Sequence, residues 1–597
     1  MDAFDKTNTK RTLGTLRLKG KVAELELADS FQASESVCGL LNDGVLALYG
    51  PQSPESTAHV QSMSSWMEIP HLEARVDFKP PGNHSVNLMP SPYVMARAFN
   101  DLVTERSFFT TRKLDSFAIV YGGDDSLPRM QEFLKNENVR SKPMTVRKTT
   151  GENNKEILNR IKGKGIRHIL LDLSVRDPKF AKFMKDAQEE GMLSEYYTYI
   201  STSLDLEQAE IPNVDASILS FSLIATPGTT YSAASALTYD AVQLFAESLA
   251  ELLKTKPLVR HNRRCGLDQS WPYGQEIRKQ LLKTKIDGMT GEVKFDEAGI
   301  RSDIKLRLLE NLGDSGKMKT VGMWTPKDGI KIDDNHLEDK KEKYRKILKE
   351  SKNLIIVTTE TGNPTSGFLV DLLDALQAEL GFKNETVEQV QGYGVRDSSG
   401  NWTGMLSRVL NLTADIALAD FTITPEREAV VDFTTGFLPT GVTVLIKKSD
   451  VGNMTEVEDL LNQDAVTYGA LGDGSTAQFL RTSKDVRHNQ MWRKMEDSCP
   501  RWFVKSMKDG LDKVKSGGFA LFAELLYTDY AMRRDCDLQR LGGLLNSDGY
   551  AIALPRGSPY TVLFSEAILK MHRSGKLDEL RRKHWNRDPP LDCSNKP

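Results

Sequence analysis

The fold of this chain is constrained most by short apolar runs that alternate with amphipathic helical segments. Residues 117–121 (FAIVY) precede a Gly-Asp turn and a helix-like segment, and residues 166–173 (IRHILLDL) repeat the arrangement. Parallel strands need a crossover connection, usually a helix, so this alternation predicts parallel sheets covered by helices. No Walker-type or GxGxxG sequence follows these runs, and a nucleotide site is therefore not supported.

The 597 residues are too many for one hydrophobic core, and the sequence divides near residue 345. Residues 326–352 are polar and densely charged, which predicts a solvated linker, in part helical. Beyond it, residues 354–359 (LIIVTT) are typical of a buried strand, and residues 367–382 of an amphipathic helix ending at a glycine. Residues 1–345 and 352–597 are the expected domains.

Composition narrows the functional classes. The hydrophobic fraction of 39% and the charged fraction of 27% are typical of a soluble globular protein, and the net charge of −3 does not favour a nucleic-acid partner. No apolar run reaches the ~18 residues that span a bilayer, and the start MDAFDKTNTK lacks the apolar core of a secretory signal. Five sequons argue weakly for an extracellular setting: Asn83, Asn384, Asn401, Asn411 and Asn453.

Cysteines and histidines give no sign of catalysis. Spacing alone does not pair the five cysteines, which are Cys38, Cys265, Cys499, Cys536 and Cys593. The nine histidines are scattered, and no nucleophile–base pair, metal-ligand spacing or phosphate loop is present. We therefore expect no enzyme activity, no metal and no cofactor.

Residues 419–433 (ADFTITPEREAVVDF) predict an anion site. A strand end is followed by Thr424 as a helix cap and Pro425 at the first helical position, which places Arg427 in the first turn. A guanidinium offers a carboxylate two parallel hydrogen bonds, and unpaired backbone N–H groups lie beside it. The alternative is a surface arginine paired with Glu428 or Asp432.

Two further segments carry candidate ligand contacts. In residues 472–480 (GDGSTAQFL), Ser475 and Thr476 follow two glycines and either cap a helix or present hydroxyl and N–H groups to a carboxylate. In residues 519–525 (FALFAEL), Glu524 is the one acid in an apolar run, so it is either exposed at a helix end or paired.

The 419–433 stretch resembles a signature of ionotropic glutamate receptors, closest to the kainate type. The resemblance implies that Arg427 holds the ligand's α-carboxylate and that Thr422 is the first threonine of the motif. Asp420 stands where the family commonly has a proline, whose carbonyl binds the ligand's ammonium. An inward Asp420 side chain would add a negative charge and alter selectivity.

The same resemblance assigns roles to the other candidates. Ser475 and Thr476 match the position that binds the distal γ-carboxylate, and Glu524 matches the glutamate that binds the ammonium. Tyr393, in GYGV, matches a tyrosine on the ligand side. Residues 534–559 (RDCDLQRLGGLLNSDGYAIALPRGSP) follow the family closely and support the Glu524 match.

The first half resembles the amino-terminal domain of kainate-type receptors, through residues 29–51, 191–207 and 286–306. The implied fold class is α/β, with two bilobed periplasmic-binding-protein-like modules. The first is a type I clamshell over residues 1–345. The second is a type II ligand-binding clamshell made of segments 352–449 and 450–597. The resemblance also implies the disulfides Cys38–Cys265 and Cys536–Cys593, with Cys499 as an odd thiol.

Besides Asp420, the sequence departs from the family in three places. The family's first strand and helix have no counterpart before Lys10, which predicts unpaired edges in the first lobe. The tyrosine turn after the first strand of the second module is shortened to residues 360–366 (ETGNPTS), with Thr365 near the usual tyrosine. The pore helices are missing between Lys448 and Met454 and after Cys593. A fragment, a splice form, a gene-model artefact and an engineered fusion all fit this pattern.

The expected function is the extracellular ligand-binding portion of a kainate-type receptor, a cation-channel subunit, that binds L-glutamate and closes its two lobes. The resemblance implies tetramers with dimers of amino-terminal domains, on the extracellular, postsynaptic side of the plasma membrane. The alternative is a soluble amino-acid-binding protein of the periplasmic type, or a ligand decoy without channel activity.

Overall fold

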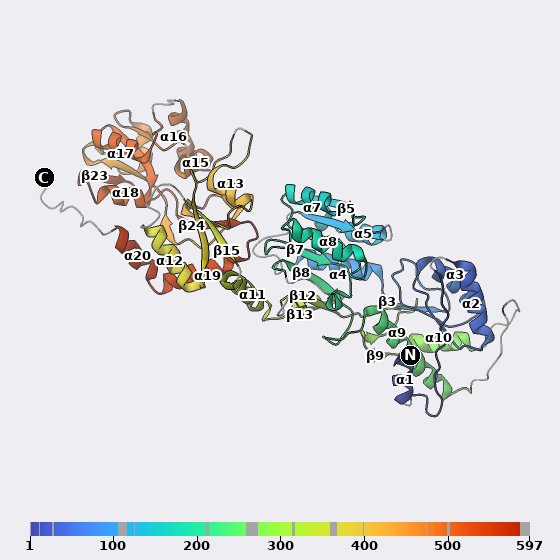
Figure 1. Ribbon diagram of the computed structural model, residues 1–597. Coiled ribbons are helices and arrows are strands. Elements are labelled where there is room, and N and C mark those ends of the chain that lie inside the picture. The colour runs from blue at the N-terminus through green and yellow to red at the C-terminus, as the bar shows by residue number, and fades with distance from the viewer. Residues whose placement is uncertain are drawn as a thin grey trace. The chain divides into compact units, whose positions relative to one another are not determined.

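The structure is a computed structural model of the 597-residue chain, which forms two compact units, Met1–Lys340 and Lys341–Pro597 (Figure 1). The residues that it describes are 2–10, 12–26, 29–105, 116–123, 126–209, 214–257, 265, 271, 273–312, 317–350, 352–358, 367–397, 399–472, 474–497 and 502–585. No helix within these ranges is both long enough and apolar enough to cross a membrane.

The first sheet of unit 1 is parallel, in the order β1-β2-β3-β11. Its strands are β1 (Leu48–Tyr49), β2 (His71–Glu73), β3 (Ser85–Pro90) and β11 (Ile300–Arg301). The helices with it are α1 (Asp2–Thr9), α2 (Ser30–Asn42), α3 (Pro54–Trp66), α9 (Ala233–Leu253) and α10 (Gly274–Lys283). The edge strands β1 and β11 span two residues each, so little of each edge is open for pairing.

The second sheet of unit 1 has the order β14-β13-β12-β8-β7-β6-β4-β5. Its strands are β4 (Phe117–Tyr121), β5 (Met144–Lys148), β6 (His168–Asp172), β7 (Thr198–Ser201), β8 (Ser217–Ser222), β12 (Leu306–Glu310), β13 (Lys319–Thr325) and β14 (Gly329–Ile332). Five neighbouring strands, in the order β5-β4-β6-β7-β8, pair in parallel. This confirms the prediction made from the alternating pattern. The last three pair antiparallel.

Helices and one short ribbon complete unit 1. They are α4 (Pro92–Thr104), α5 (Ser126–Leu134), α6 (Glu137–Arg140), α7 (Asn154–Gly163), α8 (Pro178–Glu189) and the 3-10 turn η2 (Leu206–Gln208), with the hairpin β9 (Ile286–Gly288) and β10 (Gly291–Val293). Cys38 on α2 forms a disulfide with Cys265, with the two Cα atoms 5.3 Å apart. This bond lies beside a small apolar core that includes Ala33 and Leu41.

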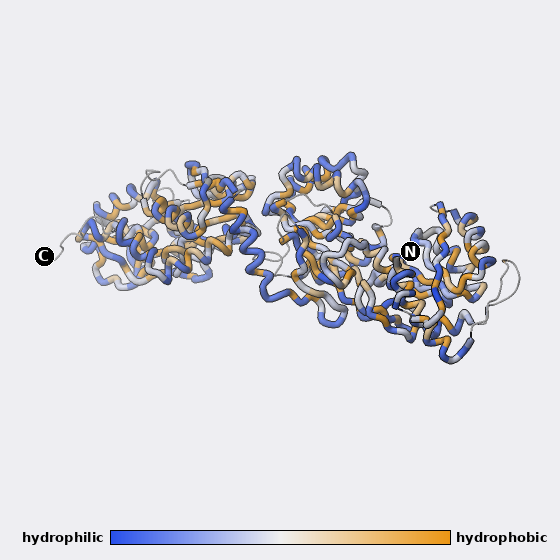
Figure 2. Tube along the Cα trace, turned by 60° about the horizontal axis from the view of Figure 1, so that its bottom comes forward, coloured by the Kyte–Doolittle hydropathy of each residue, from blue (hydrophilic) through white to orange (hydrophobic). Residues whose placement is uncertain are grey.

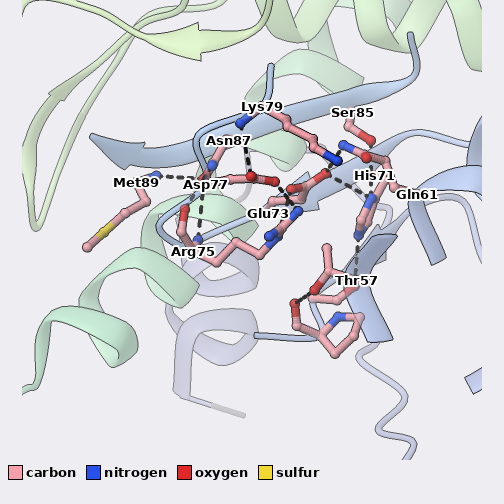
Figure 3. Close-up of polar contacts among 12 residues, drawn as sticks. Thr57, Gln61, His71, Glu73, Arg75, Asp77, Lys79, Ser85, Asn87 and Met89 are labelled. Atoms are coloured by element: carbon pink, nitrogen blue, oxygen red, sulfur yellow. Dashed lines mark hydrogen bonds and ion pairs between the residues drawn. The ribbon is translucent and has the colours of Figure 1, made fainter. Parts of the chain in front are cut away.

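A buried polar cluster lies on β2 of unit 1 (Figure 3). Glu73 is 1% exposed and lies between His71, whose Nδ1 is 3.3 Å from Oε1, and Arg75, whose Nε donates to Oε2 at 3.3 Å. Arg75 also pairs with Asp77. Burial alone would raise the pKa of Glu73, but hydrogen bonding and charge from His71 and the charge of Arg75 lower it. Glu73 therefore remains an ionised carboxylate inside the sheet.

The charged segment expected to be a solvated linker is structured. It forms β14 and the helix α11 (His336–Glu350), so the prediction of partial helix is right. Most of its described residues are exposed or half-buried, as a solvated segment requires, but one side of α11 is buried. Within unit 1, His336 Nε2 and Lys340 Nζ lie 2.6 and 3.1 Å from the buried carboxylate of Glu310. Lys340 is only 4% exposed, because its charge is matched by a residue in another strand.

The first sheet of unit 2 joins residues from both ends of this unit. It has the order β16-β15-β17-β24-β18, and β19 also pairs with β24. Its strands are β15 (Asn353–Thr358), β16 (Asn384–Gln389), β17 (Ile416–Thr422), β18 (Val431–Phe433), β19 (Leu438–Thr440) and β24 (Asp548–Pro555). The expected helix at 367–382 is α12 (Phe368–Leu380), which ends at Gly381 with a φ of +76°.

The second sheet of unit 2 has the order β21-β22-β20-β23. Its strands are β20 (Val442–Lys447), β21 (Thr467–Gly469), β22 (Phe519–Glu524) and β23 (Leu538–Leu541). The other helices of the unit are α13 (Gly404–Leu410), α14 (Pro425–Glu428), η4 (Lys448–Asp450), η5 (Val457–Asn462), α15 (Ser475–Thr482), α16 (Val486–Asp497), α17 (Met507–Ser516), α18 (Leu525–Met532), α19 (Tyr560–Arg573) and α20 (Lys576–Trp585). Figure 2 shows hydrophobic residues inside each unit and hydrophilic residues on the outer helices.

Candidate functional site

The arginine loop forms as the sequence predicts. Strand β17 ends at Thr422, and the Thr424 side chain accepts a hydrogen bond from the backbone N–H of Arg427, with Pro425 at the first helical position. The helix α14 is a single turn of four residues, after which the chain enters β18. Arg427 is thereby fixed directly behind the end of β17.

The Arg427 side chain is 6% exposed, yet it forms no ion pair with any acid of the described residues, so the alternative of pairing with Glu428 or Asp432 is wrong. Its Nη1 donates to the Thr422 carbonyl at 3.0 Å, and the guanidinium lies 5.4 Å from the centre of the Phe421 ring. Burial lowers the pKa of Arg427, although the carboxylates of Glu524 and Asp420 oppose this. A guanidinium held this way can still bind an anion, because its remaining N–H groups are available to donate hydrogen bonds.

Glu524 lies at the end of β22 and joins the two sheets of unit 2. Its Oε1 accepts hydrogen bonds from Thr422 Oγ1 at 2.6 Å and from Ser475 Oγ at 2.7 Å. Its Oε2 accepts one from the hydroxyl of Tyr550, on β24. The alternative of a solvent-facing acid is therefore wrong, because the carboxylate is half-buried and has three hydroxyl donors.

Ser475 does not cap its helix. Gly474 occupies the N-cap position of α15 and has no side chain, so the Ser475 hydroxyl is free to bind Glu524. Thr476, in the same turn, is 6% exposed. The first N–H groups of a helix have no acceptor within it, so this end of α15 offers donors to a carboxylate.

Tyr393 and Asp420 lie on the Arg427 side of the site. The Tyr393 hydroxyl donates to Asp420 Oδ1, and its ring packs edge-on against Phe421 at 5.4 Å between centres. Crowding by the surrounding protein raises the pKa of Asp420, and the charge of Glu524 raises it further. The same two causes, burial and neighbouring carboxylates, raise the pKa of Tyr393 and keep its proton on the hydroxyl.

A cavity of about 300 Å³ opens beside these groups and is lined by Thr422, Ser475, Glu524, Asn546 and Asp548. Of the candidate residues, Thr422, Ser475 and Glu524 line this cavity and bond to one another. Arg427 contacts the Thr422 carbonyl, and Tyr393 bonds to Asp420. The cavity lining does not include Arg427, Tyr393, Asp420 or Thr476. Tyr550 was not among the candidates from the sequence. The sequence did contain a signal for Tyr550, because it begins the apolar run YAIAL. A tyrosine buried in such a run needs a hydrogen-bond partner for its hydroxyl.

Other predicted residues are placed less completely. Cys536 is in a disulfide, while Cys593, Cys499 and Thr365 lie outside the described residues. Of the five sequons, Asn83, Asn401, Asn411 and Asn453 are exposed, and the side chain of Asn384 is not described. No group of three or more His, Cys, Asp or Glu side chains within the described ranges is arranged to hold a metal ion.

Comparison with protein families agrees with this geometry. Residues 3–313 match the model of the receptor family ligand binding region, which is more than half of the chain. Residues 349–450 match the ligated ion channel L-glutamate- and glycine-binding site, the segment that contains β17, Thr422 and Arg427. The chain belongs to the kainate-type ionotropic glutamate receptor family. This is a family of receptors and not of enzymes, and the α/β fold with two binding-protein-like modules is the one predicted.

Individual members of the family align along nearly all of the chain. Human glutamate receptor ionotropic, kainate 1 is 24% identical over 98% of this chain and 82% of its own length, and its Macaca fascicularis counterpart matches equally. Mouse glutamate receptor ionotropic, kainate 5 is 22% identical over 95% of this chain and 74% of its own. The aligned stretch of 769 residues exceeds the 597-residue chain, so the human receptor contains segments without a counterpart here.

Proposed function

We propose that residues 352–597, in segments 352–449 and 450–597, bind L-glutamate or a related acidic amino acid. The observation that carries this proposal is Arg427, a buried guanidinium without a carboxylate partner among the described residues, next to the carboxylate of Glu524. A buried cation without an anion is unfavourable, and an α-carboxylate would satisfy it with a bidentate pair.

The other groups complement the rest of an acidic amino acid. The ligand's ammonium would bind Glu524, in place of the hydroxyl protons that now satisfy this carboxylate. The distal carboxylate would bind at the start of α15, through the Ser475 and Thr476 hydroxyls and the first N–H groups. Asp420 contributes its carbonyl, as the family resemblance implies, and its side chain disfavours a distal carboxylate placed close to it.

Binding of this kind would favour closure of the two lobes of unit 2. Arg427 and Thr422 belong to the sheet containing β17, whereas Ser475 and Glu524 belong to the sheet containing β22 or pack on it. A ligand held by both sides binds the closed arrangement more tightly and shifts the population toward it. We propose that this closure is the signal that the chain transmits.

The wider role follows from the family. We propose that the chain is the extracellular ligand-binding portion of a plasma-membrane cation-channel subunit, at synapses, and that it assembles with other receptor subunits through residues 1–345. The Cys38–Cys265 disulfide and the exposed sequons suit an oxidising, extracellular setting. A ligand decoy without channel activity uses the same binding site and is the second candidate.

Calorimetric titration of the full chain with L-glutamate tests the binding proposal. Arg427→Lys keeps the charge and loses the fork, so affinity should fall by about 1.5–3 kcal/mol. Arg408→Lys is the matched control, because Arg408 pairs with Glu388 at the surface of the same unit. Equal glutamate affinity in the wild-type chain and in Arg427→Lys would contradict the assignment of Arg427 to the ligand's α-carboxylate.

A further inference from the structure

A second cavity within unit 2 is lined in part by Asp420. Its volume is about 500 Å³, and it is lined mostly by apolar side chains, among them Leu369, Leu373 and Leu526. Clefts of roughly 300–1,000 Å³ with a few well-placed polar groups are typical of small-molecule sites. Among the described residues of the glutamate site, Asp420 and Tyr550 also line this cavity, so the cavity adjoins that site.

One wall of the cavity is a continuous row of aromatic rings. The Trp585 and Phe368 rings meet edge-on at 5.3 Å, Phe368 stacks on Phe437 at 6.1 Å, and Phe437 lies 6.5 Å from Tyr550. All four residues line the cavity. The faces of such rings carry negative partial charge and attract organic cations.

Asp420 supplies the formal charge. Among the described residues, no basic group forms an ion pair with it. His584, which lines the cavity, and the neighbouring Lys583 each lie 2.6 Å from Asp371, so the Lys583 charge is paired there. Asp420 therefore borders an apolar space as a carboxylate whose single recorded side-chain partner is the neutral hydroxyl of Tyr393.

We propose that this cavity binds an organic ammonium ion with an aromatic or aliphatic body. The ammonium would pair with Asp420, and the body would lie along the row formed by Tyr550, Phe437, Phe368 and Trp585. This site adjoins the one that carries the proposed function and shares Asp420 and Tyr550 with it, but its ligand needs no carboxylate. The raised pKa of Asp420, caused by crowding and by the charge of Glu524, agrees with a carboxylate that a cation would stabilise.

Three probes that differ in one property each test this site by calorimetry on the full chain. They are 2-phenylethylammonium, the neutral 2-phenylethanol of similar shape, and ethylammonium, which has the charge without the ring. We expect 2-phenylethylammonium to bind at least about tenfold more tightly than either of the others, because it alone uses both the carboxylate and the rings. Equal binding of the ammonium and the alcohol would overturn the proposal.

Variants locate the binding. Asp420→Asn retains an acceptor for Tyr393 and should weaken 2-phenylethylammonium about tenfold while leaving 2-phenylethanol unchanged. Asp374→Asn is the matched control, since Asp374 is exposed on the same helix as Leu373 but does not line the cavity. Undiminished ammonium binding by Asp420→Asn would reject the site. Asp420-dependent binding supports it whether or not the chain binds glutamate, so the two proposals fail separately.

Discussion

The hydroxyl of Thr422 donates a hydrogen bond to Glu524 across 102 residues of sequence, at 2.6 Å. Thr422 ends a strand of one sheet of unit 2, and Glu524 ends a strand of the other. The contact therefore joins the two lobes. Any ammonium that takes Glu524 must replace this bond, so the free and liganded states compete for the same oxygen atoms.

The first prediction concerns the two hydroxyls on Glu524 Oε1. Thr422→Val and Ser475→Ala each remove one donor, and the remaining hydroxyl still satisfies the oxygen. The free energy needed to open the two lobes should therefore fall in the double variant by more than the sum of the losses in the two single variants. We expect the excess to be at least about 0.5 kcal/mol. Native-state hydrogen exchange of β22 and α15, without ligand, measures these energies.

Thr443→Val provides the control for that cycle. Thr443 lies on β20 in the same sheet as Glu524, and its buried hydroxyl has no hydrogen-bond partner in the described structure. Its removal should leave the opening free energy unchanged or raised. Strict additivity of Thr422→Val and Ser475→Ala would show that the two hydroxyls do not share the oxygen.

The second prediction separates binding from folding at Glu524. Glu524→Gln keeps an amide oxygen that can accept from Thr422 and Ser475, so the lobes should remain joined. It removes the charge that an ammonium needs, and glutamate affinity should fall by about 1.5–3 kcal/mol. Titration calorimetry measures the loss, with the exposed Glu496→Gln as control. Unchanged glutamate affinity would remove Glu524 from the site.

The third prediction concerns acid and unit 1. His71 and Arg75 lower the pKa of Glu73 in the folded state, so its ionised form stabilises the fold above the unfolded pKa of about 4.3. This stability is lost as the pH falls through the folded pKa. Hydrogen exchange of residues 71–90 should therefore accelerate on acidification below about pH 4.5.

Glu73→Gln tests the cause. The variant leaves Arg75 and His71 without the carboxylate, which should cost about 3–5 kcal/mol at neutral pH and remove most of the acid dependence in this segment. Glu152→Gln, at an exposed position of the same unit, should change neither quantity. An acid dependence that survives in Glu73→Gln would assign it to other groups.

The fourth prediction concerns the disulfides. Unreduced peptide mapping should recover Cys38 linked to Cys265, and Cys536 linked to Cys593. The first bond closes a loop of 227 residues, so its removal by Cys38→Ser with Cys265→Ser should cost about 2–5 kcal/mol of unfolding free energy in unit 1. Calorimetry of the reduced wild-type chain is the matched control. Recovery of Cys536 linked to Cys499 would contradict the predicted second pairing.

Regular periodicity made several elements predictable. The run FAIVY is β4, and the helix expected at 367–382 is α12, with its C-cap at Gly381. The capped turn at Thr424 was also predictable, because N-cap residue, proline and arginine are adjacent in sequence. These features depend on local sequence, in which hydrophobic period and capping chemistry act directly.

The contacts that complete the site could not be predicted from local sequence. Ser475 looked like a cap, but Gly474 takes that position and Ser475 binds a residue 49 positions away. The charged neighbours of Lys340 in the sequence predicted a solvated side chain. In the structure Lys340 is buried, and its ammonium pairs with Glu310 on β12. In each case the outcome depends on a partner from another element, which sequence spacing does not reveal.

The pairing of β24 has a consequence for how the chain is made. This strand, Asp548–Pro555, pairs with β17, β18 and β19, all of which leave the ribosome far earlier. At usual synthesis rates, roughly 10–40 s pass between the emergence of β15 and of β24. During that interval the edge of β17 that pairs with β24, which includes Phe421, has no strand beside it. Chaperones that bind nascent extended segments can therefore act on this edge before Tyr550 emerges, and the proposed glutamate site can form only after that.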